Sequence, residues 1–542
     1  MSVAVRNAQQ RLFAYRLCFL LSASQCLLWL PLCAFAQPIA IPPIEAASAH
    51  IESGPDSSDF VRTCRPGFND TPAMPKHYSQ PTILNMPLNQ LFALGQQTFV
   101  TNFNACDGAG RPATTGTGAA RTPDPLLGPR FTRVSAPETS SCAGCHSQPQ
   151  PGGAGDSSAN VFVLAQAADP VSRLILNEDF SNTWLERNTL GMFGSGAIEI
   201  LGREMTADLQ AERQGAIRQA ESSGENVTVN LLTKGISFGA LTAHSDGSVG
   251  TSAVVGVDPD LVIKPFSRKG VFRSLREFTV TAMNQHHGMQ AVERFGFGTD
   301  PDQDGVSNEL LIGDITAVTI FQAALPAPTV STQGFDPQVA DHGADLFSHV
   351  GCAGCHLPSL PLTSTKFCDP DPQNPSGTFN DTSRSYCFDL ARTGIRGNSV
   401  AAFTDLKRHV LCDSNKPHYC NEPASPLQAS DSNYAISKDQ FLTAKLWDTG
   451  NSGPWGHRGD LDTIYAAITA HGGEATPAES QFEALSNSDQ SAVVTFLRTL
   501  QMPILPMNLD PNVNMPSCLE ATATHAGGES TQRPRPDCRD HR

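Results

Sequence analysis

The chain has 542 residues, enough for about two to four compact domains, and it carries 53 acidic against 37 basic residues, a net charge of −16. This excess of acid argues against nucleic acids and anionic membrane surfaces as partners, because both repel a negatively charged protein. It is compatible with a positively charged electron-donor protein, although most acidic surfaces serve only to keep a protein in solution.

Residues 1–36 have the features of a cleavable export signal. Three arginines between positions 6 and 16 precede an apolar run over 17–33, and Ala34–Phe35–Ala36 supplies a small-residue cleavage pattern. Polar residues interrupt the apolar run, which argues against the alternative of an uncleaved membrane anchor. We therefore expect a periplasmic or secreted protein without stable membrane insertion after cleavage. A Pro/Ser/Ala-rich stretch over 37–85 is expected to form an extended N-terminal arm.

The most specific pattern is Cys-Ala-Gly-Cys-His, which occurs at 142–146 and again at 352–356. Cys-x-x-Cys-His is the attachment signature of a c-type haem, in which both cysteines bond the porphyrin and the histidine becomes an axial iron ligand. Two copies predict two covalently bound haems in preference to a zinc site or a redox dithiol. The residues concerned are Cys142, Cys145, His146, Cys352, Cys355 and His356.

The other cysteines indicate disulfides. Of the fifteen cysteines, three lie in the export signal and four in the haem motifs, and the remaining eight would form up to four bridges in an oxidising compartment. Short loops favour three pairs, although connectivity does not follow from sequence alone. The expected pairs are Cys368–Cys387, Cys412–Cys420, Cys518–Cys538 and, from the two cysteines left over, Cys64–Cys106.

A short internal repeat follows each motif, as TLGMFGSG at 189–196 and TAKLWDTG at 443–450. A duplicated half explains this better than coincidence. We expect a mainly α fold of two cytochrome c-like domains in tandem, over 86–330 and 331–507, followed by a tail at 508–542.

Helices are expected on both sides of each motif. Residues 95–103 and 343–350 precede the two motifs, and 274–287 and 461–471 follow the repeats, the last with apolar residues at i, i+3, i+4 and i+7. A Val/Thr/Leu-rich segment with Gly-Ser turns, at about 226–264, predicts a small β insertion in the first domain.

These runs resemble a known family. TAKLWDTGNSGPWGHRGDLDTIYAAITAHGGEA, from residue 443, and FEALSNSDQSAVVTFLRTL, from residue 482, are similar to the C-terminal domain of the bacterial di-haem oxidoreductases, which belong with the di-haem cytochrome c peroxidases and the methylamine-utilisation di-haem enzymes. In the first half GPRF, SCAGCHSQPQPGGAG and RNTLGMFGSGAIE agree, as does FTDLKRH at 403–409. The resemblance covers roughly residues 90–505 and is specific for the family rather than for a substrate.

The resemblance implies an enzyme in which one haem stores electrons and the other reacts with peroxide or another oxidant. A small redox protein or cytochrome would donate the electrons. Two alternatives stay open: a di-haem electron-transfer cytochrome without its own substrate, and an oxidative enzyme acting on an organic or protein substrate.

The axial ligand opposite each motif histidine decides the chemistry of each haem, because an iron with two protein ligands has no open position for an oxidant. In the related peroxidases the distal ligand of the C-terminal haem lies fourteen residues after the histidine of an aromatic-x-His-x-Gly turn. That histidine is His457 here, so the resemblance implies His471 as the distal ligand of the second haem. A helix-capping histidine is the alternative. For the first haem the candidates are His287, His286 and Met289. The pairing of His287-Gly288 with His471-Gly472 favours His287, and without any of these the haem would be five-coordinate.

Other residues have possible roles in catalysis. Trp447 and Trp455 would relay electrons or only pack against haem, and His457 would bond a propionate or act in the pocket. Glu199 and Glu204 follow the first repeat, at the place where related peroxidases carry a carboxylate that acts as acid and base.

The segment after the first domain's last helix resembles half of an EF-hand loop, with oxygen ligands at positions 1, 3, 5, 7 and 9 and glycine at position 6. Position 12 is Leu311, so Glu309 or Asp314 would have to replace the usual glutamate. We expect Ca²⁺ here, with an acidic turn as the alternative. The proposed ligands are Asp300, Asp302, Asp304, Val306 through its carbonyl, Asn308 and Glu309.

Overall fold

The computed structural model describes residues 58–64, 71–110, 141–158, 187–301, 304–375, 377–393, 395, 398–422 and 436–505. Of the described residues, 38% are helical and 16% are in strands, and the strands form small antiparallel sheets, so the fold is mixed rather than mainly helical. In the long segment between the second cysteine motif and its repeat, 357–442, the described residues form short strands and 3₁₀ turns. The export signal and the tail at 508–542 lie outside the described residues.

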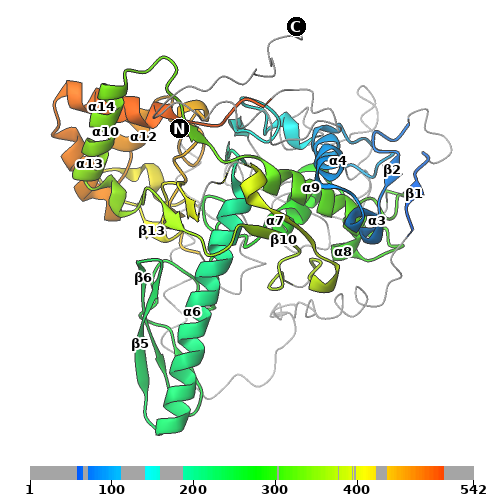
Figure 1. Ribbon diagram of the computed structural model, residues 1–542, viewed down its shortest axis with the longest axis horizontal. Helices are drawn as coiled ribbons and strands as arrows, with labels where there is room; N and C mark the ends of the chain where they lie inside the picture. Colours follow the sequence, from blue (N-terminus) through cyan, green and yellow to red (C-terminus); the bar gives the residue numbers. More distant parts are fainter. Residues whose placement is uncertain are drawn as a thin grey trace, which may run out of the picture. The chain divides into compact units, whose positions relative to one another are not determined.

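Two similar helix pairs organise the chain (Figure 1). α4 (Leu88–Val100) packs on α9 (Ile312–Ala324), and α10 (Pro337–His349) packs on α14 (Asn487–Thr499). α4 and α10 overlap the helices expected at 95–103 and 343–350, but both begin six residues or more before the expected start and end before the expected end. The motifs themselves form the 3₁₀ turns η1 (Cys142–Gly144) and η3 (Cys352–Gly354).

One glycine in each pair lets the two helices touch. A Cβ on Gly95 would lie 2.0 Å from the carbonyl oxygen of Ala317, and a Cβ on Gly343 would lie 2.0 Å from that of Ala492. No side chain fits at such a distance, so glycine is required in both places. The same contact in both pairs supports the duplication inferred from the repeat.

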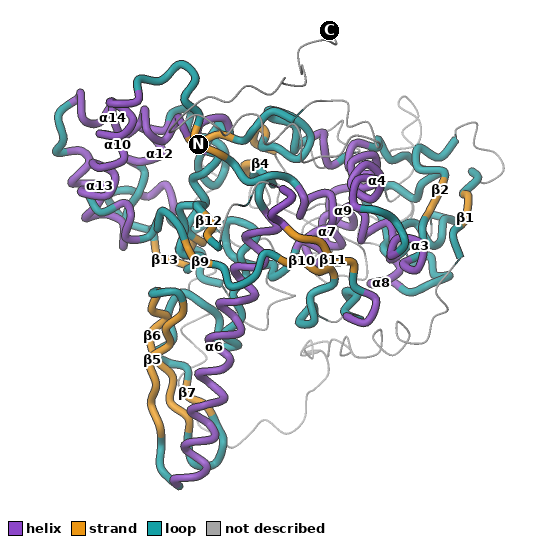
Figure 2. The backbone as a smooth tube through the Cα atoms, in the orientation of Figure 1, coloured by secondary structure: helices purple, strands orange, loops and turns teal. Residues whose placement is uncertain are grey.

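The longest helix, α6 (Ser195–Ser223), begins inside the first repeat and carries the β insertion. β5 (Val227–Thr233), β6 (Ile236–Ala243) and β7 (Val249–Gly250) form an antiparallel sheet that lies along α6, as Figure 2 shows. Alternate residues of β6, such as Phe238, are buried against the helix. The predicted β insertion is confirmed.

The helices after the repeats are also present. α7 (Leu275–Ala282) runs on into a π-helical turn, η2 (Met283–His287), and α12 (Ile464–Thr469) ends just before His471. The other described elements are α3 (Gln80–Leu84), α8 (Val292–Phe295), α13 (Thr476–Glu483), β1 (Phe60–Val61), β2 (Lys76–His77), β3 (Gly155–Ser158), β4 (Arg187–Thr189), β8 (Thr329–Val330), β9 (Leu360–Pro361), β10 (Lys366–Asp369), β11 (Tyr386–Asp389), β12 (Ser399–Val400), β13 (Arg408–Val410), β14 (Gln440–Leu442) and β15 (Leu500–Gln501).

Three of the four expected disulfides are present and confirm the predicted pairs: Cys64–Cys106, Cys368–Cys387 and Cys412–Cys420. The fourth, Cys518–Cys538, lies outside the described residues. The extended arm expected over 37–85 does not hold for 58–64 and 71–85, because β1 pairs with β2 and the first disulfide ties this segment down. Among the described helices, none is long and apolar enough to cross a bilayer.

Replacing Gly343 by Ala should destabilise the protein by about 1–3 kcal/mol, because a Cβ would overlap a backbone carbonyl that cannot move without shifting α14. The matched control is Gly215→Ala in α6, where a Cβ meets nothing within 4 Å. It should stabilise the protein by up to about 1 kcal/mol through helix propensity. Urea unfolding checks both, and equal stability of the two variants would contradict the close helix contact.

Candidate functional site

Each cysteine motif lines a large pocket. Counted out to the open solvent at its mouth, the space is about 1380 Å³ in the first pocket, beside Cys142 and Cys145, and about 1810 Å³ in the second, beside Cys352 and Cys355. None of these four cysteines is in a disulfide, whereas every other cysteine in the described ranges is. The structure therefore leaves available for attachment the cysteines that the motifs single out.

The histidine of each motif is held by the internal repeat. His146 Nδ1 donates to the carbonyl of Leu190 at 2.9 Å, and His356 Nδ1 lies 3.1 Å from the carbonyls of both Phe403 and Ala444. Leu190 and Ala444 occupy the same position of the repeat. Because a carbonyl only accepts, Nδ1 carries the proton and Nε2 keeps its lone pair for a metal.

Packing keeps both imidazoles neutral and fixes their orientation. Burial lowers the pKa of each histidine to about 4. One phenylalanine from the preceding helix lies against each ring: the centroids are 6.3 Å apart for Phe99 and His146, and 6.4 Å apart for Phe347 and His356. Neutral, oriented imidazoles with a free Nε2 are what axial ligation requires.

His471 faces His356 across the second pocket. Their ring centroids are 6.4 Å apart with an interplanar angle of 67°. If each of two imidazoles bound a metal through a bond of roughly 2 Å, their ring centroids would be about 6 Å apart. The spacing of His356 and His471 would therefore admit an iron atom between them. His471 Nδ1 donates to the carbonyl of Ala467 at 2.8 Å, which again leaves Nε2 free. The structure brings the predicted ligand pair of the second pocket together.

The corresponding helix of the first pocket offers alanine at that position. Ser274 and Thr463 cap the two helices, each accepting the N–H of the residue three places on. Counted from these caps, residues 1, 4, 5 and 8 line the pocket in both halves. The four residues are Leu275, Phe278, Thr279 and Ala282 in the first half and Ile464, Ala467, Ile468 and His471 in the second. Ala282 thus occupies the place of His471.

The first pocket's histidines come from the extra turn η2. His286 and His287 both line it. His287 Nε2 lies 3.6 Å from Cys142 Sγ, at the attachment edge of the pocket. Met289 is fully buried in the hydrophobic core and is not a lining residue. Which of these residues, if any, binds iron stays a prediction.

Neither predicted acid/base glutamate lines a pocket. Glu199 is fully buried, pairs with Arg203 and accepts the N–H of Leu275 at 2.7 Å, where α7 begins. Burial raises its pKa to about 7, against the opposing charge of Arg203. Glu204 pairs with Lys234 at 2.6 Å, at the base of the β insertion. Both have structural partners here, and their role in catalysis stays a prediction.

The two tryptophans differ in position. Trp447 is buried against Gly194, where a Cβ would lie 2.4 Å from its ring, and it lines neither pocket. Trp455 lines the second pocket, and its indole N–H donates to the carbonyl of Thr449 at 3.2 Å. Packing is therefore the evident role of Trp447.

The two pockets adjoin. The residues that line both of them are Thr189, Leu190, Gly191, Ser267, Arg268, Lys445 and His457. We call this set the shared wall. Sequence reasoning singled out only His457 as a functional residue of this wall. It missed Arg268 and Lys445, since neither belongs to a motif, although Lys445 replaces a glycine of the first repeat.

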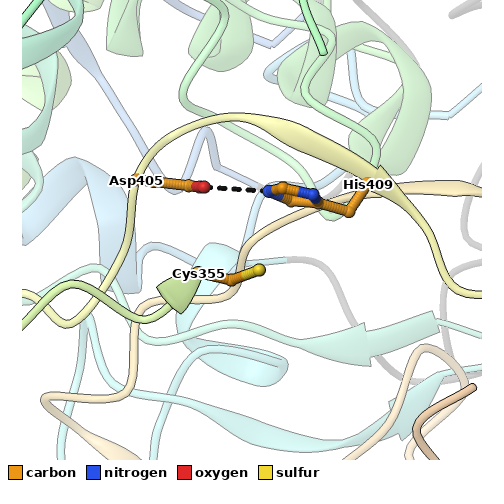
Figure 3. A group of neighbouring side chains, drawn as sticks. All are labelled: Cys355, Asp405 and His409. Atoms are coloured by element: carbon orange, nitrogen blue, oxygen red, sulfur yellow. Dashed lines mark hydrogen bonds and ion pairs between the residues drawn. The ribbon is translucent and has the colours of Figure 1, made fainter. Parts of the chain in front are cut away.

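His409, whose ring makes two hydrogen bonds to carboxylates, lies beside Cys355 (Figure 3). His409 bonds Asp405 through Nε2 and Glu474 through Nδ1, both at 2.8 Å. Since carboxylates accept, both nitrogens are protonated and the ring is an imidazolium. Burial opposes the charge, but the bonds to Asp405, Cys355 and Glu474 raise the pKa of His409 to about 11.

This cluster also has metal-ligand chemistry, since atoms of Cys355, Asp405 and His409 lie within 4.8 Å of one another. The two carboxylates already occupy both ring nitrogens, however, which argues for a structural clamp. Glu474 also accepts the N–H of Val410, and so ties the segment just after His471 to β13.

The calcium-type loop is described except for Asp302 and residue 303. Asp300 accepts the N–H groups of Asp304 and Gly305, and the Asn308 side chain accepts that of Gly298. Asp314 caps α9 and pairs with His77 at 2.9 Å, so it is already engaged. Within the described part of this loop the acidic residues form no ligand cluster. Calcium stays a prediction.

Comparison with known proteins gives little. No family model matches, and no curated protein matches. Among solved structures, a chain of hydrazine synthase from Kuenenia stuttgartiensis, pressurised with xenon, is 18% identical with a TM-score of 0.19. The match covers 35% of this chain and 55% of that one. No family is shown. This chain spans about half the length of the structure it matches, and at this TM-score the likeness carries no argument.

Replacing His409 by Gln should cost about 1–3 kcal/mol of unfolding free energy near pH 6, because two carboxylates lose a charged donor. The folded-state pKa lies above the unfolded value of about 6.5. The contribution is therefore complete below pH 6.5 and is lost as the pH rises toward 11. Urea unfolding at pH 6 and pH 9 should show a smaller cost at pH 9.

The control for His409→Gln is His342→Gln. The imidazole of His342 bonds Asp489 at the surface, and 55% of its side chain is exposed. It should change the unfolding free energy by less than about 1 kcal/mol. If the cost of His409→Gln were equal at both pH values, the imidazolium assignment would be wrong.

Proposed function

We propose that this chain is an exported di-haem c-type oxidoreductase of the peroxidase type. The residues fit two c-type haems: beside each pocket lie two cysteines that are not in a disulfide, and each motif histidine is neutral and oriented through Nδ1. When bound, haem iron would supply electron storage and the reaction with an oxidant. The three disulfides support an oxidising, extracytoplasmic compartment.

The observation that carries the proposal is the difference between the two distal helices. His471 closes the second pocket opposite His356, whereas the matching position of the first pocket is Ala282. A closed pair of imidazoles suits electron transfer, and an accessible face suits a reacting oxidant. We therefore assign electron storage to the second pocket and turnover to the first.

Side chains of the first pocket suit a small oxidant. Phe272 and Phe278 are apolar walls that would exclude bulk water. Gln322 donates to Thr279 Oγ at 2.7 Å and so holds the distal helix against α9. His286, from the extra turn, is a titratable group in the lining and would hold or pass a proton. The electron donor would be a small redox protein.

One observation favours a second candidate, an electron-transfer cytochrome without its own substrate. His286 and His287 both line the first pocket, so either would close it by binding iron.

The deciding experiment is to produce the protein with haem attached, count haems by mass, record the ferric spectrum, and measure peroxide consumption with a reduced donor. We expect two haems per chain, a high-spin component and peroxide turnover. Two haems that stay low-spin through half-reduction, without turnover, would establish the carrier. A chain without haem would end the di-haem proposal.

A pair of reciprocal substitutions tests the assignment of the two pockets. His471→Ala should make the second haem high-spin while it remains attached, because the axial nitrogen is lost. Ala282→His places an imidazole at the matching position, and should make the first haem low-spin and lower the rate of peroxide consumption at least tenfold. Spin states come from the ferric spectrum. If Ala282→His changed neither spectrum nor rate, the first pocket would not be the open one.

A further inference from the structure

The shared wall holds two cations whose side chains form no hydrogen bond or ion pair with another described residue. Arg268 and Lys445 line both pockets. Within the described part of the chain, neither side chain makes a hydrogen bond or an ion pair, and Arg268 Nε is buried. Both residues are half-buried, and partial desolvation lowers the pKa of each group. Inside a protein with a net charge of −16, such cations need a negative partner.

The protein itself supplies little negative charge here. Asp448, the carboxylate nearest in sequence to Lys445, is buried, and burial raises its pKa to about 6. Its charge acts on both cations, but among the described residues no ion pair of 4.0 Å or less joins it to either of them. Two cations therefore face one carboxyl group that only partly balances them.

The repeat shows that this wall was built asymmetrically. Lys445 and Asp448 stand where the first copy has Gly191 and Gly194. A Cβ on Gly191 would lie 2.5 Å from Asp448 Oδ2, so the first copy leaves room for the charges of the second. Holding the motif histidines needs only the carbonyls of Leu190 and Ala444, and the added charge serves another purpose.

His457 supplies a third unmatched group in the same wall. It is only 2% exposed, and neither ring nitrogen has a hydrogen-bond partner among the described residues. The Glu422 oxygen lies 3.9 Å from Nε2, beyond hydrogen-bond range. A buried donor without a partner indicates a ligand that completes it.

We propose that the shared wall binds haem propionates from both pockets, with Arg268 and Lys445 as the common cations that join the two haems into one redox unit. This rests on the proposed di-haem function. A haem carries its carboxylates opposite the vinyl groups, and the motif cysteines hold the vinyl side. The first pocket's other lining cations, Arg187 and Lys269, come from the same two segments as the wall, which gathers the positive charge in one place.

The wall predicts a shared electrostatic effect. Reducing a haem adds one negative charge, so a cation beside its propionate favours the reduced state and raises its potential. A cation that borders both haems should act on both. Lys445 and Arg268 are positioning residues in this scheme, and they need not touch an oxidant.

The test is Lys445→Met, with Lys366→Met as the matched control, since Lys366 is exposed on β10 and lines neither pocket. Mass first establishes that both haems are attached. Spectroelectrochemical titration then gives both midpoint potentials. We expect both to fall in Lys445→Met, neither to move in Lys366→Met, and both to be kept in Lys445→Arg.

Unchanged potentials with both haems attached would overturn the proposal, and a fall at one haem only would show that Lys445 serves a single pocket. If Lys445→Met does not fold, Arg268→Gln takes its place with the same expectations. A wild-type chain without haem would instead overturn the underlying function, so the two failures are distinguishable.

Discussion

The bond between each motif histidine and a repeat carbonyl is the interaction on which the rest depends. It sets the tautomer of His146 and His356, and so decides which nitrogen faces the pocket. It also explains why the repeat exists, since Leu190 and Ala444 supply the same carbonyl in each half. Everything else in a half positions this pair: the helix before the motif, its packing phenylalanine and the glycine that lets a second helix approach.

The two pockets are alike on the side of the motif histidine, so they differ mainly on the opposite, distal side. The same cap-to-pocket spacing ends in Ala282 in one half and His471 in the other. A buried network holds α7 in place: Arg276 pairs with Glu293 and Asp369, and Glu199 accepts the N–H where the helix begins. Because these charges are partnered and buried, the start of α7 is fixed, and the extra turn moves His286 and His287 beyond the position that His471 occupies.

The charge distribution divides in a similar way. Cations such as Arg276 form ion pairs with carboxylates and serve the fold, whereas Arg268 and Lys445, at the wall between the pockets, are balanced only in part by Asp448. His409 shows the opposite arrangement, one cation between two carboxylates, and it connects the proximal segment at Asp405 with the segment that follows His471. Near these pockets, therefore, the cations that are paired with carboxylates hold segments of the fold together, and the cations of the shared wall have another role.

Short-range patterns let the sequence by itself determine a good part of this protein. Two cysteine pairs, the helices around each motif and the β insertion depend on residues close together in the sequence, and the structure confirms them. The third pair, Cys64–Cys106, is 42 residues apart and was predicted only from the two cysteines left over. The helix content was overestimated, because the segment between motif and repeat gains order from disulfides and paired short strands that show no clear period. The expected haem attachment also belongs to the sequence, since it needs only a pentapeptide.

Only the tertiary structure decided which groups meet. The sequence paired His287 with His471 through the glycine that follows each, but helix caps set the register, and they pair His471 with Ala282. Glu199 seemed close to the first pocket along the chain, yet it accepts the first N–H of α7 and lines neither pocket. Arg268 and Lys445 are 177 residues apart in the numbering and share one wall. Contacts between such distant segments follow from packing, which local patterns do not encode.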